Sequence, residues 1–178
     1  MEELILIKPT LDWEQKILSL KEEFFEEHMF GNAGLMDTKN IPDWIDYLTL
    51  LEKTKPISEG WTATAFLSVR QSDQKIVGIC SIRHNIDSEE LMNISGHIGY
   101  SIAPSERRKG YAKIQLRLAL SEARKMGMDR VLVTCTDWNT ASEMTILANG
   151  GVYEDSRYDP VNKESLKRFW ISLEKKRV

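Results

Sequence analysis

The segment over residues 95–135 constrains the fold of this chain more than any other part of the sequence. It opens with an apolar run that predicts a strand over 95–103, which Pro104 ends. Residues 105–126 then carry apolar side chains at helical spacing, and a nearly unbroken apolar strand follows at 130–135. A strand, a long amphipathic helix and a buried strand in succession predict an α/β domain.

The flanking segments add helices and strands to this unit. Upstream we expect a strand, two helices and an antiparallel hairpin, over residues 4–7, 11–28, 41–53 and 62–84. Downstream, Thr140 and Glu143 match a capping box that predicts a short helix ended by Gly150-Gly151. Two last strands are expected over 152–155 and 166–173. The expected order is β-α-α-β-β-β-α-β-α-β-β, in a sheet of mixed direction.

Length and composition narrow the class of protein. We expect one domain over residues 1–178. A net charge of −3 argues against nucleic-acid binding, and the sequence shows neither a signal peptide nor an apolar run long enough to span a membrane, so we expect a cytoplasmic protein. Cys80 and Cys135 lie in apolar runs, as buried free thiols do. With His84 and His97 their spacing fits no compact zinc pattern, so we expect no metal.

Three consecutive cations, Arg107, Arg108 and Lys109, lie at the start of the long predicted helix. The helix dipole disfavours positive charge at this end. The arrangement becomes favourable if an anion docks there, since free N–H groups and basic side chains together form a phosphate cradle. Gly110 removes a Cβ where a phosphate would approach the main chain. A solvated basic turn explains the charges alone equally well.

The pattern Arg107-x-x-Gly110-x-Ala112 resembles the [QR]-x-x-G-x-[GA] signature of the GNAT superfamily of acyl-CoA-dependent N-acetyltransferases. The segment from Asn139 to the glycines at 150–151 resembles the second cofactor segment of that family. Within the superfamily, G-H-I-G-Y and R-F-W-I look like a subgroup of predicted acetyltransferases. The resemblance implies a GNAT-like mixed sheet with parallel central strands, and acetyl-CoA as the co-substrate.

The resemblance also implies which residues hold the coenzyme. Main-chain groups at the end of the 95–103 strand would pair with the pantetheine arm, and these belong to Tyr100, Ser101 and Ile102. Arg107 would open the motif, and the residues that wrap the diphosphate would be Arg108, Lys109, Gly110, Tyr111, Ala112 and Lys113. Asn139 would bind near the reactive end of the coenzyme, although a plain helix cap also explains its position.

The catalytic residues of many relatives have no counterpart here. The positions of the usual tyrosine and glutamate hold Ile146 and Thr134. His97 is a candidate base, because histidine titrates near neutrality, and Tyr153 is a candidate acid, as is Tyr111. A hydrogen-bonded strand histidine and tyrosines that pack as aromatics are the alternative interpretations.

The hypothesis from the sequence is an enzyme that moves an acetyl group from acetyl-CoA to a primary amine by direct attack. The acceptor would be a small amine or a peptide, and in this family the first two helices usually line the acceptor side. Members of the superfamily are often dimeric, so the resemblance admits a homodimer. The alternative is a non-catalytic acyl-CoA-binding sensor or interaction module, which the missing tyrosine and glutamate favour.

Overall fold

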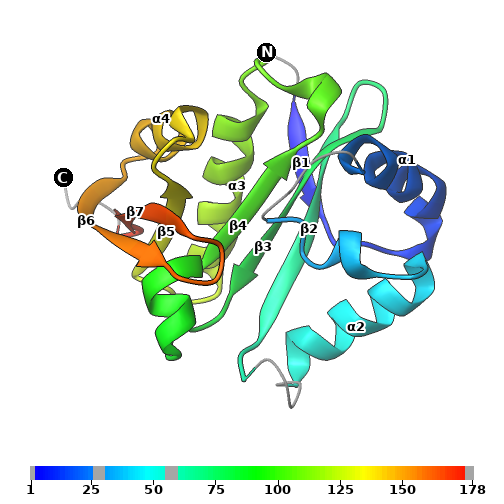
Figure 1. The fold of residues 1–178 in the computed structure, drawn as a ribbon. Helices are drawn as coiled ribbons and strands as arrows, with labels where there is room; N and C mark the ends of the chain where they lie inside the picture. Colours follow the sequence, from blue (N-terminus) through cyan, green and yellow to red (C-terminus); the bar gives the residue numbers. More distant parts are fainter. Residues whose placement is uncertain (1–2, 26–30, 55–59, 175–178) are drawn as a thin grey trace.

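A computed structural model describes residues 3–25, 31–54 and 60–174 of the chain (Figure 1). Its strands and α-helices are, in order, β1 (Leu4–Ile7), α1 (Glu14–Phe24), α2 (Ile41–Lys53), β2 (Ala63–Arg70), β3 (Lys75–Arg83), β4 (Ile98–Ile102), α3 (Tyr111–Lys125), β5 (Arg130–Thr136), α4 (Thr140–Ala148), β6 (Val152–Asp159) and β7 (Glu164–Ser172). Short helical turns are η1 (Leu11–Trp13), η2 (Leu35–Asp37), η3 (Leu91–Ser95) and η4 (Pro104–Glu106). Residues 26–28 of the helix expected over 11–28 lie outside the described residues.

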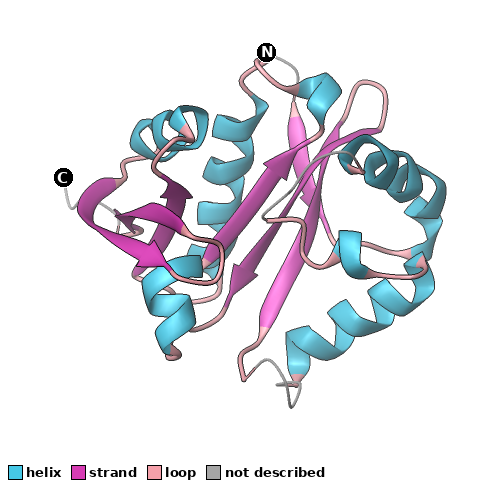
Figure 2. Ribbon diagram, viewed as in Figure 1, coloured by secondary structure: helices cyan, strands magenta, loops and turns pink. Residues whose placement is uncertain are grey.

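The strands form two sheets, ordered β1-β2-β3-β4 and β5-β7-β6 (Figure 2). Every strand pair in the described part of the chain is antiparallel, so the expected parallel central strands are not confirmed. The reason is a tertiary contact between residues 35 positions apart. The main chain of His97, just before β4, donates to the Leu132 carbonyl at 2.8 Å, and β4 itself then pairs only with β3. The sheet is therefore split between β4 and β5.

Helices cover both faces of the first sheet (Figure 1). On one face, Ile17 of α1 and Trp44 of α2 are buried in one core cluster with Leu67 of β2. On the other face, α3 packs Leu116 against Ile98, in a core shared with the second sheet. Each such side chain contributes roughly 1.5–3 kcal/mol when buried. None of the described helices is long and apolar enough to cross a membrane.

The long helix begins later than the sequence predicts. Gly110 is the N-cap of α3, with φ of +83°, and the chain before it forms the turn η4 and a loop. A residue in the left-handed region cannot continue a right-handed helix, so the helix starts at Tyr111. The three cations at 107–109 therefore lie in a loop ahead of the helix instead of in its first turn.

The structure differs from the sequence-based expectation at two further places, the N-cap of α4 and the start of β4. The N-cap of α4 is Asn139, whose Oδ1 accepts from the Ser142 N–H at 3.1 Å, while Glu143 pairs with Lys167 and forms no capping box. The residues before β4 form the π-helical turn η3, so the expected strand over 95–103 shortens to Ile98–Ile102. Cys80 and Cys135 are buried free thiols, as predicted.

Candidate coenzyme and acceptor site

The N-terminus of α3 has the features of an anion site. No side chain caps it, and a Cβ at Gly110 would meet no atom within 4 Å. The first N–H groups of any α-helix lack an intrahelical partner, and the helix dipole places positive potential there. The main chain at Tyr111, Ala112 and Lys113 therefore offers donors to a diphosphate, with room for it to approach.

The three cations of the loop differ in their surroundings. The Arg107 guanidinium turns back to the strand, where its Nε donates to the Ile102 carbonyl at 3.1 Å. Arg108 is exposed, with φ of +60°. Lys109 donates to the Glu106 carboxylate at 2.9 Å. The structure thus supplies one cation in solvent, one tied to the strand and one tied to the loop, beside the open helix end.

Glu106 is the anchor of this loop. Glu106 is only 4% exposed, and its carboxylate accepts hydrogen bonds from Arg70 at 2.8 Å, and from Lys75 and Lys109 at 2.9 Å. Burial would raise the pKa of Glu106, but the bonds from Lys75, Lys109 and Arg70 outweigh it and lower the pKa to about 2. Since Arg70 and Lys75 lie at the β2–β3 turn, the loop is fixed to the sheet through one carboxylate.

The free edge of β4 lies next to this loop. The Arg83 N–H bonds the His97 carbonyl and the Ala103 N–H bonds the Val77 carbonyl, so the odd-numbered residues of this stretch face β3. By alternation the main-chain groups of Tyr100 and Ile102 point to the other edge, where β5 does not pair. These two residues can pair with an extended pantetheine arm.

Ser101 differs from the prediction. Its main-chain groups face β3, in register with Ile79, so they are not directed to the free edge. Its hydroxyl donates instead to the Gly31 carbonyl at 3.4 Å, on the face of α1 and α2. Gly31 packs so closely that a Cβ there would lie 2.6 Å from the Tyr100 nitrogen. The loop before α2 therefore covers this face of β4.

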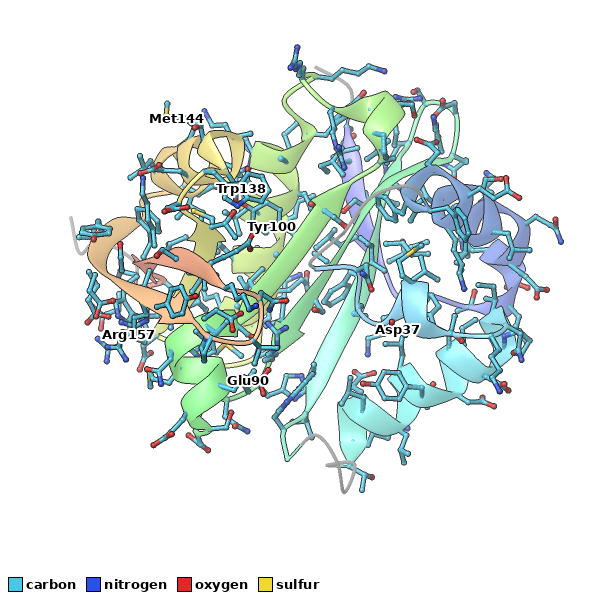
Figure 3. The ribbon with its side chains drawn as sticks, viewed as in Figure 1. Asp37, Glu90, Tyr100, Trp138, Met144 and Arg157 are labelled. Atoms are coloured by element: carbon cyan, nitrogen blue, oxygen red, sulfur yellow. The ribbon has the colours of Figure 1, made fainter. Side chains whose placement is uncertain are left out.

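Tyr100, labelled in Figure 3, lies on β4, and its hydroxyl contacts a hydroxyl of α4. The Tyr100 hydroxyl lies 2.8 Å from Ser142 Oγ, and either atom can donate. Burial raises the pKa of Tyr100, and the bond to Ser142 offsets only part of this, so the phenol stays protonated at neutral pH. Asn139 caps α4 through its Oδ1, which is the helix-cap role that the sequence analysis gave as the alternative.

His97 lies just before β4, and its side chain accepts a hydrogen bond from the main chain of β5. The ring Nδ1 of His97 accepts a hydrogen bond from the Leu132 N–H at 2.9 Å, and the main-chain N–H of His97 donates to the Leu132 carbonyl. Burial, with the positive charges of Arg83 and Arg130, lowers the pKa of His97 to about 4. A base of this pKa is weak at neutral pH, and one of its two ring nitrogens is already occupied.

The two candidate tyrosines, and the residues at the family's usual catalytic positions, make other contacts in the structure. Tyr153 is on β6, which β7 separates from β5, and its hydroxyl bonds Ser156 at 2.9 Å. Tyr111 is buried, with its hydroxyl accepting from Arg70 at 3.2 Å. Ile146 is fully buried, and Thr134 donates to the Ile94 carbonyl at 2.6 Å. Ile146 and Thr134 carry neither a phenol nor a carboxylate, so the family's tyrosine and glutamate have no replacement at these two positions.

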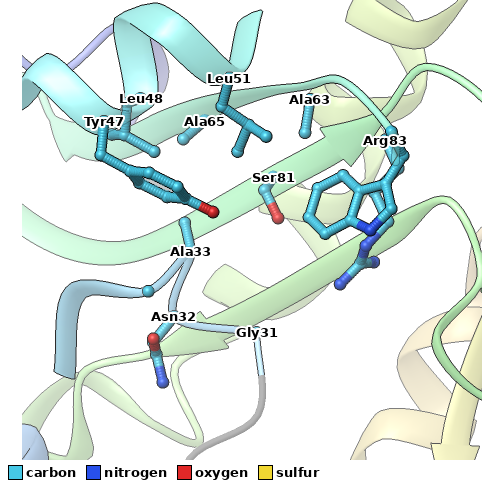
Figure 4. A pocket seen from close by; sticks show the side chains of 12 residues that line it. Gly31, Asn32, Ala33, Tyr47, Leu48, Leu51, Ala63, Ala65, Ser81 and Arg83 are labelled. Atoms are coloured by element: carbon cyan, nitrogen blue, oxygen red, sulfur yellow. The ribbon is translucent and has the colours of Figure 1, made fainter. Parts of the chain in front are cut away.

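A cavity opens on the face of the first sheet that α2 covers, beside residues 31–34 of the loop before α2 (Figure 4). It has a volume of about 210 Å³ and lies among this loop, α2, β2 and β3. Ser81 lines it and pairs with Gly99 of β4, whose missing side chain leaves room for Gly31. The cavity therefore reaches β3, the strand next to β4 in the first sheet.

Comparison with known families identifies the family of this chain. Residues 6–152 match the family model described as an acetyltransferase (GNAT) domain. The chain belongs to the GNAT acetyltransferase family. This confirms the resemblance found in the sequence. The match also covers α1 and α2, where the resemblance rested only on the order of elements. Comparison with curated proteins gives no match.

Solved GNAT structures share the fold over nearly the whole chain. A ribosomal L7/L12 alpha-N-protein acetyltransferase bound to coenzyme A is 16% identical, with a TM-score of 0.68 over 95% of this chain and 93% of that one. The microcin C7 self-immunity acetyltransferase, bound to acetyl-CoA and AMP, is 19% identical, with a TM-score of 0.64 over 97% and 93%. A spermidine N-acetyltransferase from Vibrio cholerae is 13% identical, with a TM-score of 0.65 over 96% and 95%. At these identities the likeness establishes the fold of this GNAT domain.

Two residues of the site escaped the sequence analysis. Glu106 carried a signal, since an acid beside three cations and ahead of a glycine is a ready partner for them. Its bonds to Arg70 and Lys75 depend on the tertiary fold, which brings the β2–β3 turn to the loop. Ser142 lies three residues after Asn139, but its contact with Tyr100 spans 42 positions and leaves no local pattern.

Proposed function

We propose that this GNAT protein is an N-acetyltransferase that moves the acetyl group of acetyl-CoA to a primary amine of an acceptor. The observation that carries the proposal is the uncapped N-terminus of α3, with Gly110 open to solvent, directly after the free edge of β4. A free strand edge and an open helix end in succession fit an extended arm that ends in a diphosphate. Coenzyme A or acetyl-CoA bound to two neighbours of the same fold supports this.

The residues of the site divide the binding between them. Tyr100 and Ile102 offer main-chain groups to the pantetheine arm, and the N–H groups after Gly110 hold the diphosphate. The exposed Arg108 adds a positive charge beside them. Arg107 holds the Ile102 carbonyl and so joins the end of β4 to the phosphate loop.

Acetyl-CoA supplies an activated acetyl group as a thioester. A neutral amine attacks its carbonyl carbon, the N–C bond forms, and the C–S bond breaks. The nitrogen gives up one proton to water, and the departing sulfur takes one up. Attack of a free amine on a thioester needs positioning more than a strong base, which agrees with the low pKa of His97. In this proposal the hydroxyl pair of Tyr100 and Ser142, in which the phenol is protonated at neutral pH, donates a proton to the sulfur.

The hydroxyl pair gives a direct prediction. Tyr100→Phe and Ser142→Ala should each lower kcat about tenfold to a hundredfold, because removal of a general acid costs at least that much. Steady-state thiol release measures kcat, and calorimetry should show an acetyl-CoA Kd within about twofold of the parent. Tyr153→Phe, an exposed tyrosine on β6, is the matched control and should leave kcat unchanged. Equal kcat for all three variants would exclude the pair as the acid.

The function itself is tested by thiol release from acetyl-CoA in the presence of single amines. Release that rises with amine concentration, together with a product heavier by one acetyl group, supports the enzyme. Saturable binding of acetyl-CoA with no release for any amine, peptide N-termini included, would refute transfer and leave the acyl-CoA-binding sensor. Ile146 and Thr134 occupy the positions of the family's usual tyrosine and glutamate, and the absence of these two groups at those positions is the feature that favours a sensor.

A further inference from the structure

A buried amide lies between α3 and the first sheet. Gln115, on the inner face of α3, is 0% exposed, and its Nε2 donates to Ser68 Oγ of β2 at 2.8 Å and to the Ser101 carbonyl of β4 at 3.4 Å. Among the described residues, its Oε1 has no hydrogen-bond partner. A polar group in the core with one end unpaired costs stability, which points to a role other than stability.

The amide lies over a glycine of the strand between its two partners. Gly78 of β3 pairs with Ser68 of β2 on one side and with Ile102 of β4 on the other. A Cβ at Gly78 would lie 2.4 Å from the Ser101 oxygen and 2.9 Å from Gln115 Nε2, which is closer than packed atoms approach. Glycine at this position therefore allows the amide and the Ser101 oxygen to meet.

The Ser101 oxygen is tilted out of the plane of the sheet, toward α3. Ser101 pairs with Ile79, so its carbonyl faces β3. A Gly78 side chain would point to the face of the sheet that α3 covers, and the Ser101 oxygen extends into the space that it would occupy. A carbonyl oxygen has two lone pairs, so that of Ser101 can accept from the strand and from Gln115 together. The amide thus fixes the tilt of this carbonyl.

The tilt of the Ser101 carbonyl also sets the direction of the next N–H. The peptide group between Ser101 and Ile102 is planar and trans, so its C=O and its N–H point in opposite directions. The Ile102 N–H is therefore directed away from β3, to the edge of β4 where no described strand pairs. A rotation of the peptide plane turns both groups together, so a contact at the carbonyl is transmitted to the free edge.

We infer that Gln115 is a positioning residue for the coenzyme, which aims the Ile102 N–H at the pantetheine arm through the Ser101 carbonyl. The inference rests on the proposed function, in which this N–H pairs with the arm, and it adds a residue that acts from the core. Arg107 donates to the Ile102 carbonyl at 3.1 Å, so side chains hold the peptide groups on both sides of Ile102.

The test removes the amide without leaving its buried partner unpaired. In Gln115→Met/Ser68→Ala both polar side chains become apolar, which is close to neutral or stabilising for a buried pair, and Ser68→Ala alone is the matched control that keeps Gln115 on Ser101. We expect the Kd for CoA, from calorimetry, to be about threefold to tenfold weaker for the double variant, since one neutral hydrogen bond contributes about that much. The control should bind CoA within about twofold of the parent, and the double variant should unfold at a urea midpoint no lower than that of the control.

A second measurement follows the Ile102 N–H itself. In protein whose isoleucines carry an NMR-active nitrogen isotope, the Ile102 amide resonance should move when CoA is added to the Ser68→Ala control, and should move less in the double variant. Gln115→Leu/Ser68→Ala takes the place of the double variant if the methionine protein does not fold. Equal CoA affinity with an equal Ile102 response in the folded double variant would overturn the inference, as would weaker binding that comes with a lower urea midpoint. No binding of CoA by the parent would instead refute the proposed function.

Discussion

Glu106→Gln is expected to lower the free energy of unfolding by about 3 kcal/mol and to weaken acetyl-CoA binding. The amide is isosteric with the carboxylate but leaves Arg70, Lys75 and Lys109 without the negative charge they surround. Loss of one partner from a buried ion cluster is costly because the remaining charges keep their desolvation penalty. The loop that carries Arg107–Gly110 is fixed through this carboxylate, so its release should disorder the diphosphate site. Urea unfolding and calorimetry measure the two effects.

The pH dependence of stability verifies the cause. The pKa of Glu106 falls from 4.5 to about 2 on folding, which corresponds to about 3 kcal/mol. This contribution is fully present above pH 4.5 and is lost as the pH falls toward 2. The Glu106→Gln variant should lack that part of the acid limb. Glu122→Gln, which removes a surface pair with Lys125, should cost no more than about 0.5 kcal/mol. Equal losses for the two variants would show that the cluster is not the anchor of the loop.

His97→Ala is expected to destabilise the fold by about 3 kcal/mol, while His97→Asn recovers much of this. The alanine variant leaves a cavity and removes the acceptor of the buried Leu132 N–H, whereas the asparagine Oδ1 can replace Nδ1. Because these bonds join the start of β4 to β5, the loss should also weaken coenzyme binding. Urea unfolding and acetyl-CoA calorimetry on the three proteins measure this.

The same substitution separates a structural role from a catalytic one. Folding lowers the pKa of His97 from 6.5 to about 4, so the neutral form is favoured and stability is lost as the pH falls from 6.5 toward 4. His97→Asn should remove that slope and leave the pH profile of kcat/KM unchanged. If the folded asparagine variant instead loses turnover, and the acid limb of the kcat/KM profile disappears with it, His97 is the base after all.

Local patterns in the sequence identify the elements of this fold better than they identify where the elements end. The helix at 41–53 and the hairpin at 62–84 follow from proline near the first turn, apolar spacing and β-branched residues, and α2, β2 and β3 occupy them. The start of α3 depends on the left-handed conformation of Gly110, which spacing does not reveal. The split between β4 and β5 depends on the hydrogen bonds of His97 to Leu132, which are tertiary.

The candidate site shows the same division. The glycine and the cations of the 107–110 loop could be predicted, because a phosphate cradle needs them close together in the sequence. The different tasks of Arg107 and Lys109 could not, since these are set by Ile102 and Glu106 in the folded chain. The cavity is built from four separate segments, and its lining is a property of their packing alone.

Calorimetric titration with acetyl-CoA, on the parent protein and on Gly110→Val, tests the central claim most directly. A β-branched residue is strongly disfavoured at φ of +83°, and its side chain would fill the open space before α3. We predict saturable one-to-one binding by the parent and at least about a tenfold weaker Kd for the variant, from a loss of 1.4 kcal/mol or more. No binding by the parent, or equal binding by a folded Gly110→Val protein, would contradict the placement of the diphosphate at this helix end.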